Sequence, residues 1–149
     1  MSGHKLSVMS TTLVTRARQF VAALPHAEAL SIRVSDVAEG AAWLAMPYDM
    51  RLVGDPETGV IHGGAVSALM DTAGGVAVIT HPEGVMSTAT LDLRIDYMRA
   101  AEPGQPITAH AICHHMTRSV AFVRATATEG TGDTPVAIAT GTFVVERST

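Results

Sequence analysis

The residues best suited to chemistry lie in the segment His62-Gly63-Gly64 and at Asp71, nine residues after the histidine. Residues 63 to about 80 are almost all small or apolar, which predicts a buried helix. Asp71 is the only charged residue between positions 58 and 82. A carboxylate in such apolar surroundings suits a general base or a nucleophile. The alternative is a structural Asp71, satisfied by backbone donors or by an arginine such as Arg94.

The two glycines start the predicted helix, where backbone N–H groups have no partner within the helix. With no side chain in the way, a carbonyl oxygen could approach the Gly63 and Gly64 N–H groups at the positive end of the helix dipole. Such donors form an oxyanion site for acyl transfer. The alternative is that the glycines only permit a tight turn into the helix. His62 is a candidate base, but we favour a role in orienting this loop by hydrogen bonding.

The spacing of these groups predicts a dimer. Gly63 and Asp71 are eight residues apart, which is about 12 Å along one helix axis. An oxyanion donor and a base that act on the same carbonyl group must each lie within about 3 Å of the reacting atoms. One copy of the helix cannot meet both conditions, whereas two copies related by a two-fold axis can, with two shared sites. A stripe of small residues beside the acid would let two copies approach: Gly64, Ser67, Ala68, Gly74 and Gly75.

The remaining pattern predicts an α+β fold in one domain, residues 1–149. An N-terminal helical extension is expected over residues 1–25, with helical spacing from 10 to 24. Alternating apolar residues predict two short strands, from residue 30 and over 41–46, and residues 48–59 have the composition of a loop. Four longer strands are expected over 87–99, 107–117, 119–128 and 136–146. Their short connections predict an antiparallel meander, so that one buried helix would face a six-stranded sheet.

Composition narrows the class of protein. The chain has 149 residues, a net charge of −4 and no basic run, which argues against nucleic acid as a partner. No apolar run is long enough to span a membrane. Cys113 is the single cysteine, which excludes an internal disulfide and favours a reducing compartment. The first residues lack the pattern of a cleaved secretory signal, and we therefore expect a cytoplasmic protein.

Several segments together resemble one known family. They are residues 59–64 (GVIHGG) with Asp71, 87–98 (STATLDLRIDYM), 101–104 (AEPG) and 137–143 (AIATGTF). They are similar to the hotdog-fold acyl-CoA thioesterases of the phenylacetate-degradation (PaaI-like) type, and the likeness covers most of the chain from about residue 30. The resemblance implies a hotdog fold, in which one long helix is wrapped by a curved antiparallel sheet of five to six strands. It also implies subunits joined edge to edge, often as a dimer of dimers, and hydrolysis of a thioester to free acid and CoA without a metal or cofactor.

The resemblance assigns roles to residues of the motif. The Gly63 N–H would polarise the thioester carbonyl, His62 would support its loop, and Asp71 of the partner subunit would activate water or attack directly. Thr90 matches a Ser/Thr position that helps to place the water beside that acid. The chain departs from many relatives at Pro56, where they carry an asparagine six residues before the histidine. The contribution of that asparagine must come from another residue or be lost.

Other residues are candidates for contacts with substrate. Arg99, at the end of a predicted strand, and Arg118, on a tight turn before Ser119, could bind the phosphates of CoA, or could be solvated surface arginines. Trp43 and Tyr48 are candidates to line the acyl pocket, although core packing explains Trp43 equally well.

The histidines near the cysteine do not predict a metal site. His110 and His114 would lie about 13 Å apart on a strand, and His114 and His115 would point to opposite faces. Cys113, in the middle of a predicted strand, is interpreted as a small core residue. Two further functions remain open: a hotdog hydratase or dehydratase acting on hydroxyacyl thioesters, and a non-catalytic acyl-CoA-binding or regulatory module.

Overall fold

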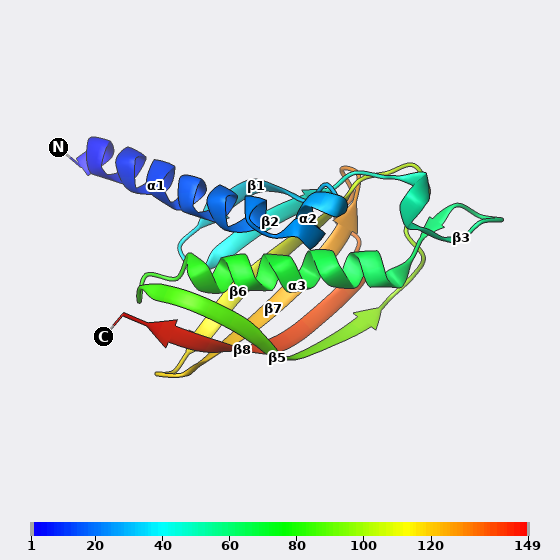
Figure 1. Cartoon of the computed structure of the whole chain (residues 1–149). Helices are drawn as coiled ribbons and strands as arrows, with labels where there is room; N and C mark the ends of the chain where they lie inside the picture. The colour runs from blue at the N-terminus through cyan, green and yellow to red at the C-terminus, as the bar shows by residue number, and fades with distance from the viewer. Residues whose placement is uncertain (1, 149) are drawn as a thin grey trace.

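The computed structural model describes residues 2–148, with side chains from residue 11 onward. Three α-helices, one short 3-10 helix and eight strands follow one another along the chain (Figure 1). Their bounds are α1 Ser2–Ala22, α2 Pro25–Ala29, β1 Arg33–Ala38, β2 Ala41–Met46, η1 Met50–Leu52, β3 Val53–Asp55, β4 Val60–Ile61, α3 Gly63–Ile79, β5 Val85–Tyr97, β6 Ile107–Met116, β7 Val120–Glu129 and β8 Ala137–Arg147. No helix in this range is long and apolar enough to cross a membrane.

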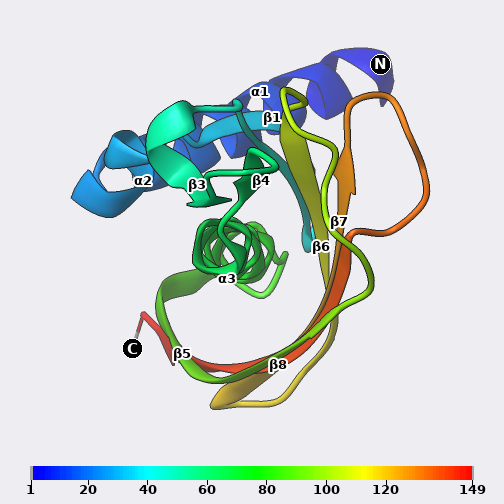
Figure 2. The same cartoon turned by 90° about the vertical axis from the view of Figure 1, so that its right-hand side faces the viewer.

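Six strands form one antiparallel sheet in the order β1-β2-β6-β7-β8-β5. Seen along α3, the sheet curves around the helix and covers it on one side (Figure 2). Residues alternate between the two faces of each strand, so that every second side chain of β6, β7 and β8 points to the helix. Many of these inward residues are alanines, which let the helix lie close to the sheet: Ala109, Ala111, Ala121, Ala125, Ala127, Ala137 and Ala139. The expected α+β hotdog fold is therefore confirmed.

The expected meander of the last four strands is wrong for β5. Strands β6, β7 and β8 are consecutive neighbours, but β5 pairs with β8 at the edge of the sheet. Residues 98–106 carry the chain from β5 past the ends of β8 and β7, where Met98 donates to the Val136 carbonyl and Gly130 donates to the Pro106 carbonyl. Strand pairing depends on contacts between distant residues, and the local pattern of β5 does not reveal which strand it joins.

The two ends of the expected loop at 48–59 are ordered by hydrogen bonds. Asp49 accepts from the Arg51 N–H at the start of η1, and Asp55 accepts from Thr58 in the turn between β3 and β4. The Arg51 guanidinium holds the pKa of Asp49 below its ordinary value, and the Thr58 hydroxyl does the same for the pKa of Asp55. This segment is therefore a 3-10 turn and a small hairpin, which leads directly into α3.

The N-terminal part of the chain packs at the β1 edge of the six-stranded sheet. Helix α1 runs along β1 and α3 (Figure 1). The Arg16 guanidinium, on α1, donates to the Val85 carbonyl at the start of β5. The buried side chains of Ala17 and Val21 fix the helix to this position. The strand expected from residue 30 begins only at Arg33, because the N–H groups of residues 30–32 donate to carbonyls of α2 and close the end of that helix.

Candidate active site

Asp71 and Thr90 meet between α3 and the edge strand. The Thr90 hydroxyl donates a hydrogen bond to Oδ1 of Asp71 over 2.6 Å. The register of β5 against β8 shifts between Thr90 and Asp92, so a β-bulge lies beside this pair. Arg94, which could have held Asp71 in a structural role, forms its ion pair with Asp96 over 3.2 Å instead. Asp71 is half-buried, and its Oδ2 has no partner within residues 2–148.

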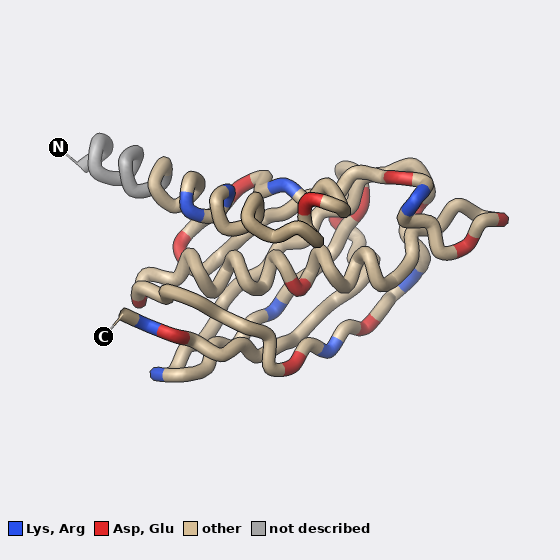
Figure 3. The backbone as a smooth tube through the Cα atoms, viewed as in Figure 1, with Lys and Arg blue, Asp and Glu red and all other residues tan. Residues whose placement is uncertain are grey.

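Helix α3 carries a single charge in an otherwise uncharged helix. Figure 3 shows one acidic position along it, which the sequence identifies as Asp71. The acid opens onto a cavity of about 120 Å³. This cavity is lined by residues of α1, α3, β5 and β8 and by the N-cap residue of α2: Phe20, Leu24, Asp71, Thr72, Gly75, Thr88, Ala89, Thr90 and Phe143. The arrangement offers a carboxylate, a hydroxyl and a partly open cavity beside them.

In the His62-Gly63-Gly64 segment, the N–H groups of the two glycines have different surroundings. His62 is the N-cap of α3, and its Nδ1 accepts a hydrogen bond from the Gly64 N–H over 2.8 Å. The Gly64 donor, expected to contact substrate, is therefore used within the loop. The Gly63 N–H has no acceptor within the described residues and lies at the positive end of the helix.

Neighbouring residues hold this loop in place. The His62 N–H donates to the Leu52 carbonyl over 2.8 Å. A Cβ atom at Gly54 would lie 2.8 Å from the Cα of His62, so this close approach of the hairpin to the loop requires a glycine. Because Nδ1 of His62 is an acceptor, the proton of its neutral ring is on Nε2. These contacts match the orienting role that we favoured for His62.

Tyr97 is a residue of the site that the sequence analysis missed. Its hydroxyl donates to the Gly63 carbonyl over 2.7 Å, and a Cβ at Gly63 would lie 3.2 Å from its ring. Tyr97 ends β5, and its contact with the start of α3 follows from the position of β5 at the sheet edge. An aromatic residue at a strand end was the available signal, but it does not specify a partner 34 positions away.

Trp43 and Tyr48 do not line the cavity at Asp71. Trp43 lies on the face of β2 opposite to the buried Ala42 and Leu44, and its ring stacks on His110 with centroids 4.2 Å apart and planes inclined by 8°. The Tyr48 hydroxyl donates to the Gly59 carbonyl over 2.7 Å and so supports the hairpin. Strand alternation and the hairpin direct both rings away from this cavity, and a role of either residue in an acyl pocket stays a prediction.

The other histidines and the cysteine form no site of their own. Burial lowers the pKa of His110 and raises the pKa of the Cys113 thiol. His114 and His115 are exposed at a β-bulge in β6. No group of three or more potential ligands that could hold a metal ion occurs in the part of the chain that the structure describes.

The two candidate phosphate-binding arginines lie at opposite ends of β7. Arg99 forms an ion pair with Glu129 and donates to the Thr134 carbonyl over 3.0 Å, so its guanidinium is engaged within the chain. Arg118 and Ser119 are exposed in the turn between β6 and β7. Within one chain, the structure does not bring Arg99 and Arg118 together.

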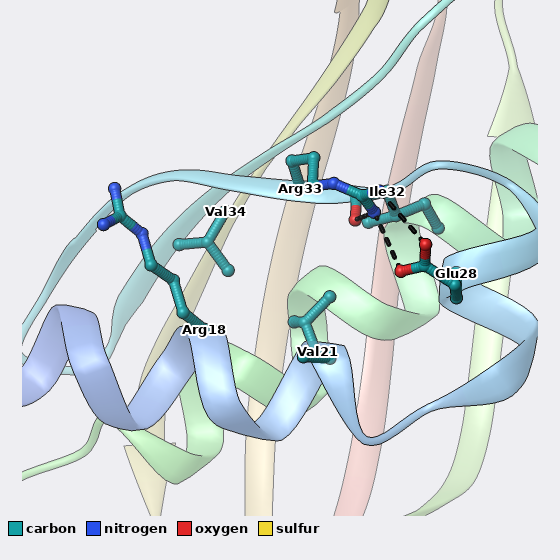
Figure 4. A pocket seen from close by; sticks show the side chains of 7 residues that line it. Arg18, Val21, Glu28, Ile32, Arg33 and Val34 are labelled. Atoms are coloured by element: carbon teal, nitrogen blue, oxygen red, sulfur yellow. Dashed lines mark hydrogen bonds and ion pairs between the residues drawn. The ribbon is translucent and has the colours of Figure 1, made fainter.

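Three further hollows lie near the N-terminal helices, and one of them, of about 420 Å³, includes Glu39 and His81 beside α1. The remaining two lie closer to α2 and β1. One, of about 280 Å³, adjoins the loop at the start of α3 and includes His26, Arg51 and His62. The other, of about 300 Å³, lies between α1 and β1, where Figure 4 shows Arg18 and Arg33 at the rim of an apolar floor. Its one carboxylate, Glu28, is paired with Arg33 over 3.3 Å. Neither of these two hollows contains a carboxylate free to act on a substrate.

Known proteins resemble this chain in sequence and in fold. Residues 58–136 match the model of the Thioesterase superfamily. A Halobacterium salinarum protein, provisionally named an esterase, is 35% identical over 124 residues, which cover 79% of this chain and 82% of the relative. A crystal structure of a Pseudomonas aeruginosa protein has a TM-score of 0.80 and 39% identity, covering 89% of this chain and 98% of the other.

A mutant of the phenylacetic acid degradation protein PaaI from Thermus thermophilus is also similar. Its structure has a TM-score of 0.71 and 30% identity, and the match covers 81% of this chain and 98% of that chain. The matched residues of the family model include the loop at Gly63, Asp71 and Thr90. The chain belongs to the Thioesterase superfamily, and its structural relatives include PaaI proteins.

Proposed function

We propose that this protein is an acyl-CoA thioesterase, which hydrolyses a thioester to a free acid and CoA. The observation that supports the proposal best is the carboxylate of Asp71, oriented by Thr90 beside a cavity and left with a free oxygen. The Gly63 N–H supplies the second requirement, a donor with no acceptor of its own among the described residues. The reaction needs no metal or cofactor in this scheme.

The two groups come from different protomers. Gly63 and Asp71 lie on one continuous helix, and eight residues of helix separate them by about 12 Å. Among the described strands, β5 pairs with β8 alone, so its other edge is free to join a second copy. Leu91 on this strand is 60% exposed, as expected for a side chain that a partner would cover. We therefore propose an edge-to-edge dimer with two shared sites, which two dimers extend to a tetramer.

In the proposed reaction, the Gly63 N–H stabilises the negative charge that develops on the carbonyl oxygen. Asp71 of the partner takes a proton from water held by Thr90, the water oxygen bonds to the carbonyl carbon, and the C–S bond breaks. The proton then passes to the sulfur of CoA. Alternatively, Asp71 attacks directly and forms an anhydride, which water hydrolyses after CoA has left. A single turnover in H₂¹⁸O separates the two, because only the second route can place ¹⁸O in Asp71.

The loop at the start of α3 keeps the donor in position. His62 and Tyr97 hold the peptide group between Gly63 and Gly64 from both ends, at the Gly64 N–H and at the Gly63 carbonyl. Pro56 stands in the exposed turn of the hairpin before this loop. The scheme does not use the residue at position 56. We place the reaction in the cytoplasm, where the free thiol of Cys113 and the thiol of released CoA stay reduced.

The hydrolase is favoured over the two other functions. A hydratase of this fold relies on a histidine together with an acid, whereas His62 is bonded to the Gly64 N–H and Asp71 to Thr90. A binding module needs no free carboxylate beside the cavity, and Asp71 provides one. These observations support hydrolysis, although neither names the acyl group.

Release of free thiol from a panel of aliphatic and aromatic CoA esters tests the proposal. We expect turnover without added metal, and Asp71→Asn to lower kcat about 10²- to 10⁴-fold, as loss of a general base does. Equal rates for Asp71→Asn and the parent would defeat the assignment. Hydration of crotonyl-CoA would indicate a hydratase, and binding with no product in a single-turnover experiment would indicate a binding module.

A further inference from the structure

The cavity at Asp71 is lined in part by residues outside the family match, which are Phe143 on β8 and a wall from the N-terminal part of the chain. Phe20 on α1 and Leu24 just after it line the cavity, whereas the superfamily model matches residues 58–136. Helix α1 is held from two directions, by the buried Val21 and by the bond from Arg16 to the start of β5. The wall is therefore a fixed part of the site in this chain.

The cavity extends from the reacting groups along α3. Gly75 is one helical turn beyond Asp71, about 6 Å along the axis. Thr88 is two residues before Thr90 and on the same side of β5, which gives a similar depth of roughly 7 Å. Its volume of about 120 Å³ is slightly less than that of a cavity that accepts benzene, which is roughly 150 Å³.

Polar groups along this wall are already satisfied. The Thr72 hydroxyl donates to the Ala68 carbonyl over 2.7 Å, and the Thr88 hydroxyl donates to the Val144 carbonyl over 2.8 Å. The methyl carbon of Thr88 faces Gly75. Beyond the Asp71–Thr90 pair, the cavity therefore presents hydrocarbon, which suits the apolar end of an acyl group.

Gly75 leaves space that packing does not require. A Cβ atom there would lie 3.8 Å from the Phe20 ring and 3.9 Å from the Thr88 methyl, which is ordinary contact. At the adjacent Gly74, a Cβ would lie 2.6 Å from the ring of Phe143, so that glycine is needed for packing. Glycine destabilises the interior of a helix relative to alanine. Because no packing contact requires Gly75, its effect is to keep this part of the cavity empty.

We propose that Phe20, Leu24 and Gly75 form the pocket for the acyl end and limit this enzyme to short acyl groups, of about six carbons or one ring. This inference rests on the proposed thioesterase function. The thioester carbonyl lies at Asp71, and the acyl chain runs along α3 until the ring of Phe20 stops it. Specificity is thus set by a helix outside the part of the chain that matches the superfamily.

The test measures kcat/KM for straight-chain CoA esters from acetyl to dodecanoyl and for phenylacetyl-CoA. Gly75→Ala fills the cavity, and we expect at least a 10-fold loss with hexanoyl-CoA and phenylacetyl-CoA but a change within twofold with acetyl-CoA, since one methylene in an apolar pocket is worth about 10- to 200-fold. Phe20→Ala should shift the preferred chain to longer acyl groups. Gln19→Ala, at an exposed position of α1 next to Phe20, is the matched control and should keep the wild-type profile.

The outcomes separate this inference from the function on which it rests. If the wild type hydrolyses thioesters and the profile is the same in Gly75→Ala and Phe20→Ala, the pocket lies elsewhere and the inference is overturned. If the wild type hydrolyses none of them, the proposed function fails. The pocket is then tested by calorimetric binding of the same esters, where an unchanged chain-length preference in Gly75→Ala overturns it. Phe20→Leu replaces Phe20→Ala if the smaller side chain prevents folding.

Discussion

Mixing two inactive variants tests whether each site is shared between protomers. Asp71→Asn removes the acid and keeps the Gly63 donor. Gly63→Pro removes the N–H and keeps the acid. Proline suits this position, because Gly63 is the first residue of α3 and His62 before it has an extended backbone with ψ of 134°. The added ring meets Tyr97, whose side chain is 51% exposed and can move outward.

The expected activity of the mixture follows from counting sites. Each variant alone should retain about 1% of wild-type kcat or less, since loss of one oxyanion donor costs about 10²- to 10³-fold. Random pairing at equal amounts makes half of the dimers mixed, and each mixed dimer has one intact site and one doubly defective site. Co-expressed chains should therefore have about one quarter of the wild-type activity.

The assay is thiol release by the two variants purified separately, after co-expression, and after simple mixing without exchange of protomers. Differently tagged chains allow the mixed dimer to be isolated, and it should have about half of the wild-type activity. Circular dichroism and size exclusion confirm that both variants fold. Activity of the mixed dimer at the level of the separate variants would refute a shared site and with it the reasoning from the helix spacing.

The remaining predictions concern single residues. Thr90→Val removes the hydroxyl that donates to Asp71. Its kcat should fall about 10-fold or more, since a hydrogen bond to a charged group contributes about 1.5–3 kcal/mol. Thr90→Ser should be close to wild type, and an unchanged kcat in Thr90→Val would show that the hydroxyl is dispensable. Burial lowers the pKa of His110, so the unfolded chain binds more protons than the folded chain in mild acid. The free energy of unfolding should then decrease as the pH falls from the ordinary histidine pKa toward the folded-state value, and less so in His110→Gln; fluorescence of the single tryptophan, which stacks on this ring, should titrate below the ordinary value. Arg118→Gln should raise KM for an acyl-CoA several-fold and leave KM for the matching N-acetylcysteamine thioester unchanged, whereas equal effects on both would exclude a contact with the nucleotide.

Local patterns predicted the elements whose signals are local. Strand 41–46 and the helix from Gly63 agree with β2 and α3, because period-two alternation and a long apolar run are properties of the segment itself. The hairpin of β3 and β4 was missed, because its strands are only three and two residues long and β3 contains a glycine and an aspartate. The prediction that β5 lies next to β6 in a meander was also wrong, because the pairing of β5 with β8 depends on contacts between residues far apart in the sequence.

The same distinction applies to the site. Spacing within one helix identified Gly63 and Asp71, because both lie on α3. Tyr97 and Phe20 reach the site from a sheet edge and from a helix before the sheet, and nothing in their local sequence indicates that. From the sequence, the N–H groups of Gly63 and Gly64 were predicted to be equivalent donors. In the structure the Gly64 N–H donates to His62, which leaves the Gly63 N–H free among the described residues.

The four glycines of α3 show how one helix can serve fold and site together. Gly64 has no room for a Cβ, which would lie 2.8 Å from Nδ1 of His62, and Gly74 has none because of the ring packed against it at 2.6 Å. These two glycines are therefore needed for packing. Gly63 leaves an amide donor uncovered, and Gly75 leaves space beside Asp71. Alanine at Gly74 should thus lower stability first, whereas alanine at Gly75 should preserve stability and change substrate choice, which separates packing from function within adjacent residues.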